Sequence, residues 1–379
     1  MKTVALVELE YHNEVLRSFL LQLLSQEIDV IVFTTEFNYN QIQDLQKEQK
    51  IHWVLKGNNE SRYNFLINAL ITNVNSWIFI GFDTITKQFD ELNIPHNAHY
   101  VIHDLNTSVR PKEYIQLSLN PLKYLKERIK YLQFILRKEA EHQRSFLSKF
   151  TSLLVPSQSV LDYAKNNIKS NFRFQCSMFT LNEFEVKEMI SETIRIVIPG
   201  SIDFNRRNYD EVYLSFEKIG GLFKRKVELV FLGSTKSSTP NRFLNKFENI
   251  PNLQIKTFDK FINQSEFDNE MSKAHFLILP IQRMFKYKIF IEERSKTCVS
   301  GNINDMVRFA KPSLIPSYYE LDKNLESSCK RYQSVEELQK LILLWVNDLE
   351  YTKLYKNIDQ SIKEFQADKL GKHLIETIL

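Results

Sequence analysis

Short apolar runs alternate with longer amphipathic segments through the first half of the chain. The runs Thr3–Glu8 and 29–33 are rich in β-branched and aromatic residues, which is typical of buried strands. The segments that follow them carry apolar residues at every third or fourth position, as helices packed on a sheet do. Further strands are expected at Ile51–Leu55, 77–80 and 99–102. This alternation predicts a parallel sheet with helices on both faces, the doubly wound α/β layout.

The same alternation begins again in the second half. Strands are expected at 194–199, 226–232, Leu253–Phe258 and 276–280, with helices between them such as Tyr209–Ile219. The acidic segment 182–192 separates the two series and is the expected linker. We therefore expect two Rossmann-like domains, at residues 1–181 and 193–358, followed by a terminal helix at residues 359–379.

A long basic helix is expected between about residues 120 and 150. Its apolar positions keep the helical period, and eight lysines and arginines lie among them. Such a helix could lie on an anionic membrane surface. Because Glu127, Glu139 and Glu141 are interleaved with the basic residues, we favour instead a packed helix with a solvated charged face.

Composition excludes several classes of protein. The formal net charge of the 379 residues is only +4, which argues against a dedicated nucleic-acid binder. The three cysteines are widely spaced, so neither a disulfide framework nor a zinc site is indicated. The amino terminus enters a strand directly without a secretion signal, and no apolar run approaches the ~20 residues of a membrane span. We expect a cytoplasmic protein whose membrane contact is at most peripheral to the inner face.

Two stretches of the second half have the chemistry of phosphate binding. In the first, a strand ends at Gly200 and Ser201, and Arg206 and Arg207 follow just before a helix. Arginine presents a planar fork of donors that matches phosphate oxygens. The alternative is a surface loop in which these arginines pair with neighbouring aspartates.

The second stretch is Ser300-Gly301-Asn302, which follows a strand and a loop and opens a helix. The start of a helix presents free N–H groups and a partial positive charge, which suit a phosphate. Strands of a parallel sheet end at the same edge. We therefore expect the two stretches to converge on one anionic group.

The second stretch also resembles a known family. It is similar to the nucleotide-sugar motif of glycosyltransferases with the GT-B fold, in particular the large retaining family with two glutamates eight positions apart. Alignment on Lys311-Pro312 places Asp305 at the second glutamate, Thr297 at the first and Ala310 at a glycine of the motif. The chain thus resembles a divergent member, with one acid shortened and the other absent.

The resemblance implies a fold and an activity. In the GT-B fold two Rossmann-like domains face each other across a cleft, and the terminal helix crosses back to the first domain. The implied activity is metal-independent transfer of a hexose-like sugar from a nucleotide-sugar donor to a saccharide or lipid-linked saccharide acceptor, in polysaccharide or glycoconjugate synthesis. The donor is a substrate, and no separate cofactor is implied. The donor would contact the two stretches above and Asp305.

The acceptor would meet the first domain. A strand there ends in His103-Asp104, similar to the His-Asp ending that this strand has in the family. His103 would orient an acceptor hydroxyl and Asp104 would serve as a base or hold the histidine. His12 and Asn13, after the first strand, are further acceptor-side candidates. A histidine capped by local backbone is an equally good interpretation of His103.

Two other functions remain open from the sequence. A nucleotide-sugar epimerase has the same fold and would change the sugar without any acceptor. A non-catalytic relative that binds a glycan or a partner is suggested by the absence of the first glutamate.

Overall fold

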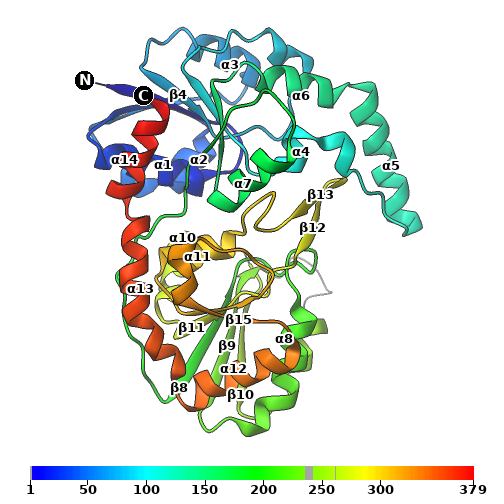
Figure 1. The fold of residues 1–379 in the computed structure, drawn as a ribbon, viewed down its shortest axis with the longest axis vertical. Helices are drawn as coiled ribbons and strands as arrows, with labels where there is room; N and C mark the ends of the chain where they lie inside the picture. The colour runs from blue at the N-terminus through cyan, green and yellow to red at the C-terminus, as the bar shows by residue number, and fades with distance from the viewer. Residues whose placement is uncertain (1, 235–241, 261) are drawn as a thin grey trace. The chain divides into compact units, whose positions relative to one another are not determined.

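A computed structural model of the chain describes residues 2–234, 242–260 and 262–379 (Figure 1). The chain forms two compact units. The first contains residues 1–179, 286–299 and 367–379, and the second contains residues 180–285 and 300–366. The segment 286–299, which the sequence placed in the second domain, therefore packs with the first unit.

The first unit is built on a seven-stranded parallel sheet. Its strand order is β3-β2-β1-β4-β5-β6-β7, so β1 lies between β2 and β4, where the order of the sheet reverses. The strands are β1 (Thr3–Glu8), β2 (Asp29–Thr34), β3 (Ile51–Leu55), β4 (Ser76–Phe79), β5 (Ala98–Val101), β6 (Ser152–Val155) and β7 (Phe174–Cys176). The predicted doubly wound sheet is confirmed.

Side chains of β1 alternate between the two faces of the sheet and contribute to the hydrophobic core on each face. Val4 and Leu6 face one side of the sheet, and Ala5 and Val7 face the other; all four are completely buried. On the Val4 side lies α1, and the Ala5 side is covered by side chains of α3, α6 and α7. The helices of the unit are α1 (Asn13–Ser25), α2 (Glu36–Gln41), α3 (Arg62–Ala69), α4 (Leu105–Val109), α5 (Pro121–Leu136), α6 (Glu139–Leu147) and α7 (Gln158–Asn167).

The long basic helix expected at 120–150 is two helices. α5 ends at Leu136 and α6 begins at Glu139. Between them Lys138 has a φ of +50°, in the left-handed region, which an α-helix does not contain. The two helices therefore run in different directions.

A short hairpin lies in the segment that the sequence left as a loop. It consists of β12 (Met284–Tyr287) and β13 (Phe290–Glu293). Phe290 packs against Phe134 of α5 with ring centroids 5.4 Å apart, and the N–H of Gln116 donates to the carbonyl of Ile289 at 2.8 Å. These contacts hold the hairpin on the first unit.

The second unit has a six-stranded parallel sheet in the order β10-β9-β8-β11-β14-β15. Its strands are β8 (Thr193–Pro199), β9 (Lys226–Ser234), β10 (Leu253–Phe258), β11 (Phe276–Ile278), β14 (Ser313–Pro316) and β15 (Cys329–Tyr332). Its helices are α8 (Tyr209–Ile219), α10 (Gln264–Ser272), α11 (Gly301–Arg308), α12 (Val335–Asn347) and α13 (Tyr355–Ser361). Phe216 of α8 and Trp345 of α12 are buried on one face of the sheet, in a core with Ile196 of β8.

The chain ends in α14 (Ala367–Ile378), which packs on α1 of the first unit. The Ser25 hydroxyl donates to the carbonyl of Ala367 at 2.9 Å, and the Gln26 amide donates to that of Asp368 at 2.9 Å. Leu374 and Ile378 join the core on the α1 side of the sheet. Among the helices that the structure describes, none has the length and apolar character to cross a membrane.

Candidate functional site

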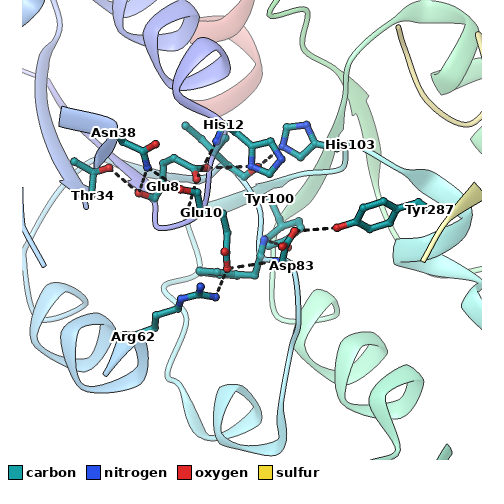
Figure 2. Close-up of polar contacts among 12 residues, drawn as sticks. Glu8, Glu10, His12, Thr34, Asn38, Arg62, Asp83, Tyr100, His103 and Tyr287 are labelled. Carbon is teal, nitrogen blue, oxygen red and sulfur yellow. Dashed lines mark hydrogen bonds and ion pairs between the residues drawn. The ribbon is translucent and has the colours of Figure 1, made fainter. Parts of the chain in front are cut away.

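Polar side chains gather in the first unit where β1, β4 and β5 end (Figure 2). The loop after β1 is folded around Glu8, whose side chain is completely buried. One carboxylate oxygen of Glu8 accepts the N–H of Glu10 at 2.6 Å. The backbone carbonyl of Glu8 accepts the Thr34 hydroxyl at 2.7 Å and the Asn38 side-chain amide at 3.3 Å. Parallel doubly wound sheets bind ligands at the point where the strand order reverses, and this loop lies there.

His12 and His103 come together over this loop. Their rings are stacked, with centroids 4.1 Å apart and an angle of 6° between the planes. The other carboxylate oxygen of Glu8 lies 3.6 Å from Nδ1 of His12. Burial alone would lower the pKa of His12, but Glu8, together with the charges of Asp83 and Asp104, more than offsets this and the pKa is raised. The buried carboxylate of Glu8 therefore favours the protonated form of His12.

His103 has the opposite electrostatic setting. Its Nε2 is 2.5 Å from the carbonyl of Ile80, to which it donates, and its ring also contacts Phe179. Burial lowers its pKa to about 3, and proximity to His12 adds to the effect. His103 is thus neutral near pH 7. Its Nε2 proton is donated to a backbone carbonyl, which agrees with the alternative expected from the sequence, a histidine capped by local backbone.

A second group of charges lies beside the histidines. Glu10 pairs with Arg62 and accepts the N–H of Asp83 at 3.4 Å. Tyr287 of the hairpin donates to Asp83 at 3.2 Å (Figure 2). Burial raises the pKa of Glu10, although Arg62 opposes the shift. Glu8, Glu10 and Asp83 were not predicted from the sequence; their only signal there is that they lie at or just after the ends of β1 and β4.

Asp104 and Asn13 stand at helix starts. Asp104 is the residue before α4 and forms an isolated backbone bridge with Cys298, and Asn13 is the first residue of α1. The start of α4 is held by Glu292 of β13, whose carboxylate accepts the N–H of Asn106 at 3.2 Å and both the N–H and the hydroxyl of Thr107, at 2.7 and 2.6 Å. Burial, followed by the charge of Asp104, raises the pKa of Glu292 to about 7.

In the second unit the two expected phosphate-binding stretches meet. Arg207 donates from Nε to Oδ1 of Asn302 at 3.1 Å and from Nη1 to the carbonyl of Ser201 at 2.7 Å. Asn302 in turn donates to the carbonyl of Pro199 at 2.8 Å. The loop after β8 and the first turn of α11 are therefore tied to each other.

Gly200 is required by this arrangement. Its φ is +87°, and a Cβ placed on it would lie 2.3 Å from Nη2 of Arg207. The backbone of the loop can pass under the guanidinium only because no side chain is present.

The remaining donor-side candidates differ in exposure. Arg206 is half exposed, and its Nε lies 3.4 Å from Oδ2 of Asp203, as the surface-loop alternative expected. Ser300 is buried and donates its N–H to the Tyr319 hydroxyl at 3.1 Å. Gly301 opens α11, is exposed, and has open space where a Cβ would stand. Asp305 lies in the second turn of α11. The first backbone N–H groups of α11 give its start a partial positive charge that suits an anion.

The aligned motif positions have distinct surroundings. Thr297 is buried in the first unit, and its hydroxyl accepts the N–H of Glu293 at 2.8 Å, so it takes part in a local turn. Ala310 has a φ of +49°, in the left-handed region that favours glycine. This backbone conformation accounts for the glycine that the motif has at that position.

Comparison with known proteins identifies the fold. No protein-family model and no curated protein sequence matches the chain. Among solved structures, sucrose-phosphate synthase from Thermosynechococcus elongatus has a TM-score of 0.60 at 10% identity, covering 100% of this chain and 98% of that one. Anabaena HepE in complex with UDP and glucose has a TM-score of 0.60 at 8% identity, covering 100% and 99%. A complex of S. aureus MnaA with UDP has a TM-score of 0.56 at 12% identity, covering 100% and 96%. The predicted GT-B fold is confirmed over the whole chain.

Proposed function

We propose that this GT-B chain is a glycosyltransferase that moves a sugar from a nucleotide-sugar donor to a saccharide or lipid-linked saccharide acceptor. The observation that carries the proposal is the tie between Arg207 and Asn302, which brings the Gly200 loop and the first turn of α11 together. The presence of UDP and glucose in the similar HepE structure supports a donor of this class.

On the donor side the diphosphate would lie in front of Gly301. Negative charge builds on the diphosphate as the sugar leaves, and fixed N–H groups aimed there stabilise the transition state more than the ground state. Arg206 would exchange its exposed pairing with Asp203 for the phosphate oxygens. These groups would neutralise the leaving group without a metal ion. Arg207 would act indirectly, by positioning the loop.

On the acceptor side we assign the proton-handling role to His12 rather than to His103. A general base needs a partner that orients it, and Glu8 provides one for His12. His103 would position His12 by stacking. The role expected for Asp104 remains a prediction.

Titration of the purified protein with UDP, GDP and ADP tests the donor half of the proposal. One of the three should bind, and Arg206→Ala should weaken it about 10- to 100-fold, the range for loss of one charged hydrogen-bonding partner. Lys218→Ala, at an exposed lysine of α8, is the matched control and should bind as the wild type does. Failure of the folded wild type to bind any of them would reject the proposal.

Incubation with the nucleotide sugar alone separates the two alternative functions. A changed sugar without any acceptor would identify an epimerase. Tight nucleotide binding with no turnover of any donor would identify a binding protein.

A further inference from the structure

Helix α5 has two opposite apolar faces. One face packs on the hairpin, where Phe134 is 4% exposed and contacts Phe290. Glu127 lies on the same face, pairs with Lys286 at 2.7 Å and accepts the N–H of Ser118 at 2.5 Å. The residues that pack on this face all belong to the first unit.

The other face is uncovered. Leu125, Ile129, Leu132 and Leu136 are 63%, 48%, 51% and 80% exposed. Their spacing of four, three and four residues places them in one stripe, about 180° around the helix from Phe134. Figure 1 shows α5 at the edge of the first unit, away from its sheet. The outward face of a surface helix is ordinarily polar, so this stripe requires a partner.

Basic residues flank the exposed stripe. Lys126 and Arg128, both exposed, lie on its two sides, one helical turn from Ile129 and from Leu132 respectively. Lys123 and Lys130 are also exposed, but their spacing places them on the opposite face, with Phe134. Glu127 is the only acidic residue of α5, and it points to the hairpin. Glu139 and Glu141 belong to α6, and Glu141 pairs with Lys112 at 2.5 Å. The acids therefore lie outside the exposed stripe. α5 is packed through Phe134 and its basic residues are exposed, as expected from the sequence, but the second, exposed apolar face was not expected.

We propose that α5 docks on a membrane surface that carries anionic lipid headgroups. The stripe would enter the boundary between headgroups and acyl chains while Lys126 and Arg128 contact phosphate groups. A second copy of the chain is a poorer partner for this face. Symmetric pairing through the stripe would bring Lys126 and Arg128 of the two copies together, and like charges oppose such contact. The proposal does not depend on the proposed glycosyltransferase activity.

Sedimentation with vesicles tests this proposal with the full-length protein. Vesicles of phosphatidylcholine with 30% phosphatidylglycerol, about a third anionic lipid as on charged membranes, are compared with pure phosphatidylcholine. We expect the wild type to bind the anionic vesicles and to dissociate from them as salt is raised. The variant L125Q/I129Q/L132Q should bind on the order of 100-fold more weakly, because three apolar side chains no longer leave water. K126Q/R128Q should weaken binding about 30-fold, at about a factor of five per charge.

Two controls match these variants. K165Q/K169Q removes two exposed lysines elsewhere in the first unit, and Ile71→Gln removes a side chain that is 84% exposed. Both should bind vesicles as the wild type does, and circular dichroism should show all variants folded. Equal binding by the stripe variant, or no binding by the wild type, would overturn the proposal. So would a wild-type dimer that the stripe variant converts to a monomer, since the stripe would then belong to a second copy.

Discussion

Arg206 and Arg207 are neighbours in the chain with different surroundings. Arg207 is 9% exposed and its guanidinium holds Ser201 and Asn302, whereas Arg206 is half exposed. Arg207→Ala should lower the free energy of unfolding by about 3 kcal/mol, because buried hydrogen-bonding groups lose a charged partner. Arg206→Ala should change it by less than about 0.5 kcal/mol. Urea unfolding of the two variants measures both values.

The two arginine variants control for each other, because each removes one guanidinium from the same loop. Equal losses of stability would mean that the Arg207 contacts contribute no more than a surface pair does.

The stacked histidines respond to acid in opposite ways. The pKa of His103 falls to about 3 on folding, so the unfolded chain binds a proton first and the folded state loses stability as the pH falls below about 6.5. His103→Gln keeps an N–H donor for Ile80 without titrating. Relative to the wild type, this variant should gain about 1 kcal/mol for each pH unit from 6 to 4, measured by urea unfolding across that range.

His12→Gln provides the opposite comparison. The pKa of His12 is raised on folding, so its contribution is present at low pH and is lost as the pH rises through that pKa. This variant should be at its greatest disadvantage in acid. Parallel pH profiles for the two variants would contradict both assignments.

The sequence identified His12, His103, Gly200 and Arg207 as notable because histidine, glycine and arginine have recognisable chemistry at strand ends. It did not identify Glu8, which looks like any charged residue at the end of a strand. Complete burial of a carboxylate depends on backbone donors from its own loop, and no hydrophobic pattern reports their positions.

At the scale of elements, Glu292 joins the hairpin to α4. Its pKa is raised to about 7 by burial, so folding favours the protonated acid. Its stabilising effect is therefore greatest below pH 4.5 and declines as the pH rises to 7. Glu292→Gln retains an oxygen for Thr107 and removes the titration. The cost of this substitution should be about 2 kcal/mol smaller at pH 8 than at pH 5 in denaturant unfolding.

The stability cost of Glu292→Gln should fall as the pH rises, whereas the cost of replacing an ordinary paired carboxylate should rise with pH. Burial alone would raise the pKa of Glu127, but Lys286, 2.7 Å away, and the N–H of Ser118 lower it, so Glu127→Gln serves as the comparison. If Glu292→Gln became more costly as the pH rose, Glu292 would be charged in the fold and the interpretation would be wrong.

Helices and strands with a clear hydrophobic period in their sequence were predicted at the correct residues, and the short strands of the hairpin were not. β1, β10 and α8 begin and end at the expected residues, because each carries its own apolar pattern between polar ends. The hairpin of β12 and β13 was missed, since two four-residue strands gain their stability from Phe134 and α4 rather than from their own pattern.

At the scale of the whole molecule, the close packing of α14 on α1 depends on Gly371. A Cβ at this position would lie 2.3 Å from the carbonyl oxygen of Gln22 and 2.7 Å from Oγ of Ser25. Gly371→Ala should destabilise the protein by about 1–3 kcal/mol, because the helix backbones would have to separate. Thermal unfolding gives the value. Gly221→Ala, where nothing lies within 4 Å of an added Cβ, should not show this loss.

The overall fold followed from the sequence because both large sheets are parallel and their central strands are buried on both faces. Such sheets produce two series of apolar runs with helices between them, and that pattern is visible without any contact information. The assignment of residues 286–299 to the first unit was not visible, because it depends on tertiary contacts between the hairpin and α5.

The division of the chain also bears on its synthesis. The polypeptide changes unit after residues 179, 285, 299 and 366, and α14 belongs to the unit that was begun first. A fragment that stops near residue 181 would lack both the hairpin and α14, leaving Phe134 without Phe290 and the α1 side of the sheet without Leu374 and Ile378. Synthesis must therefore reach α14 before the earliest-made half of the protein can complete its packing.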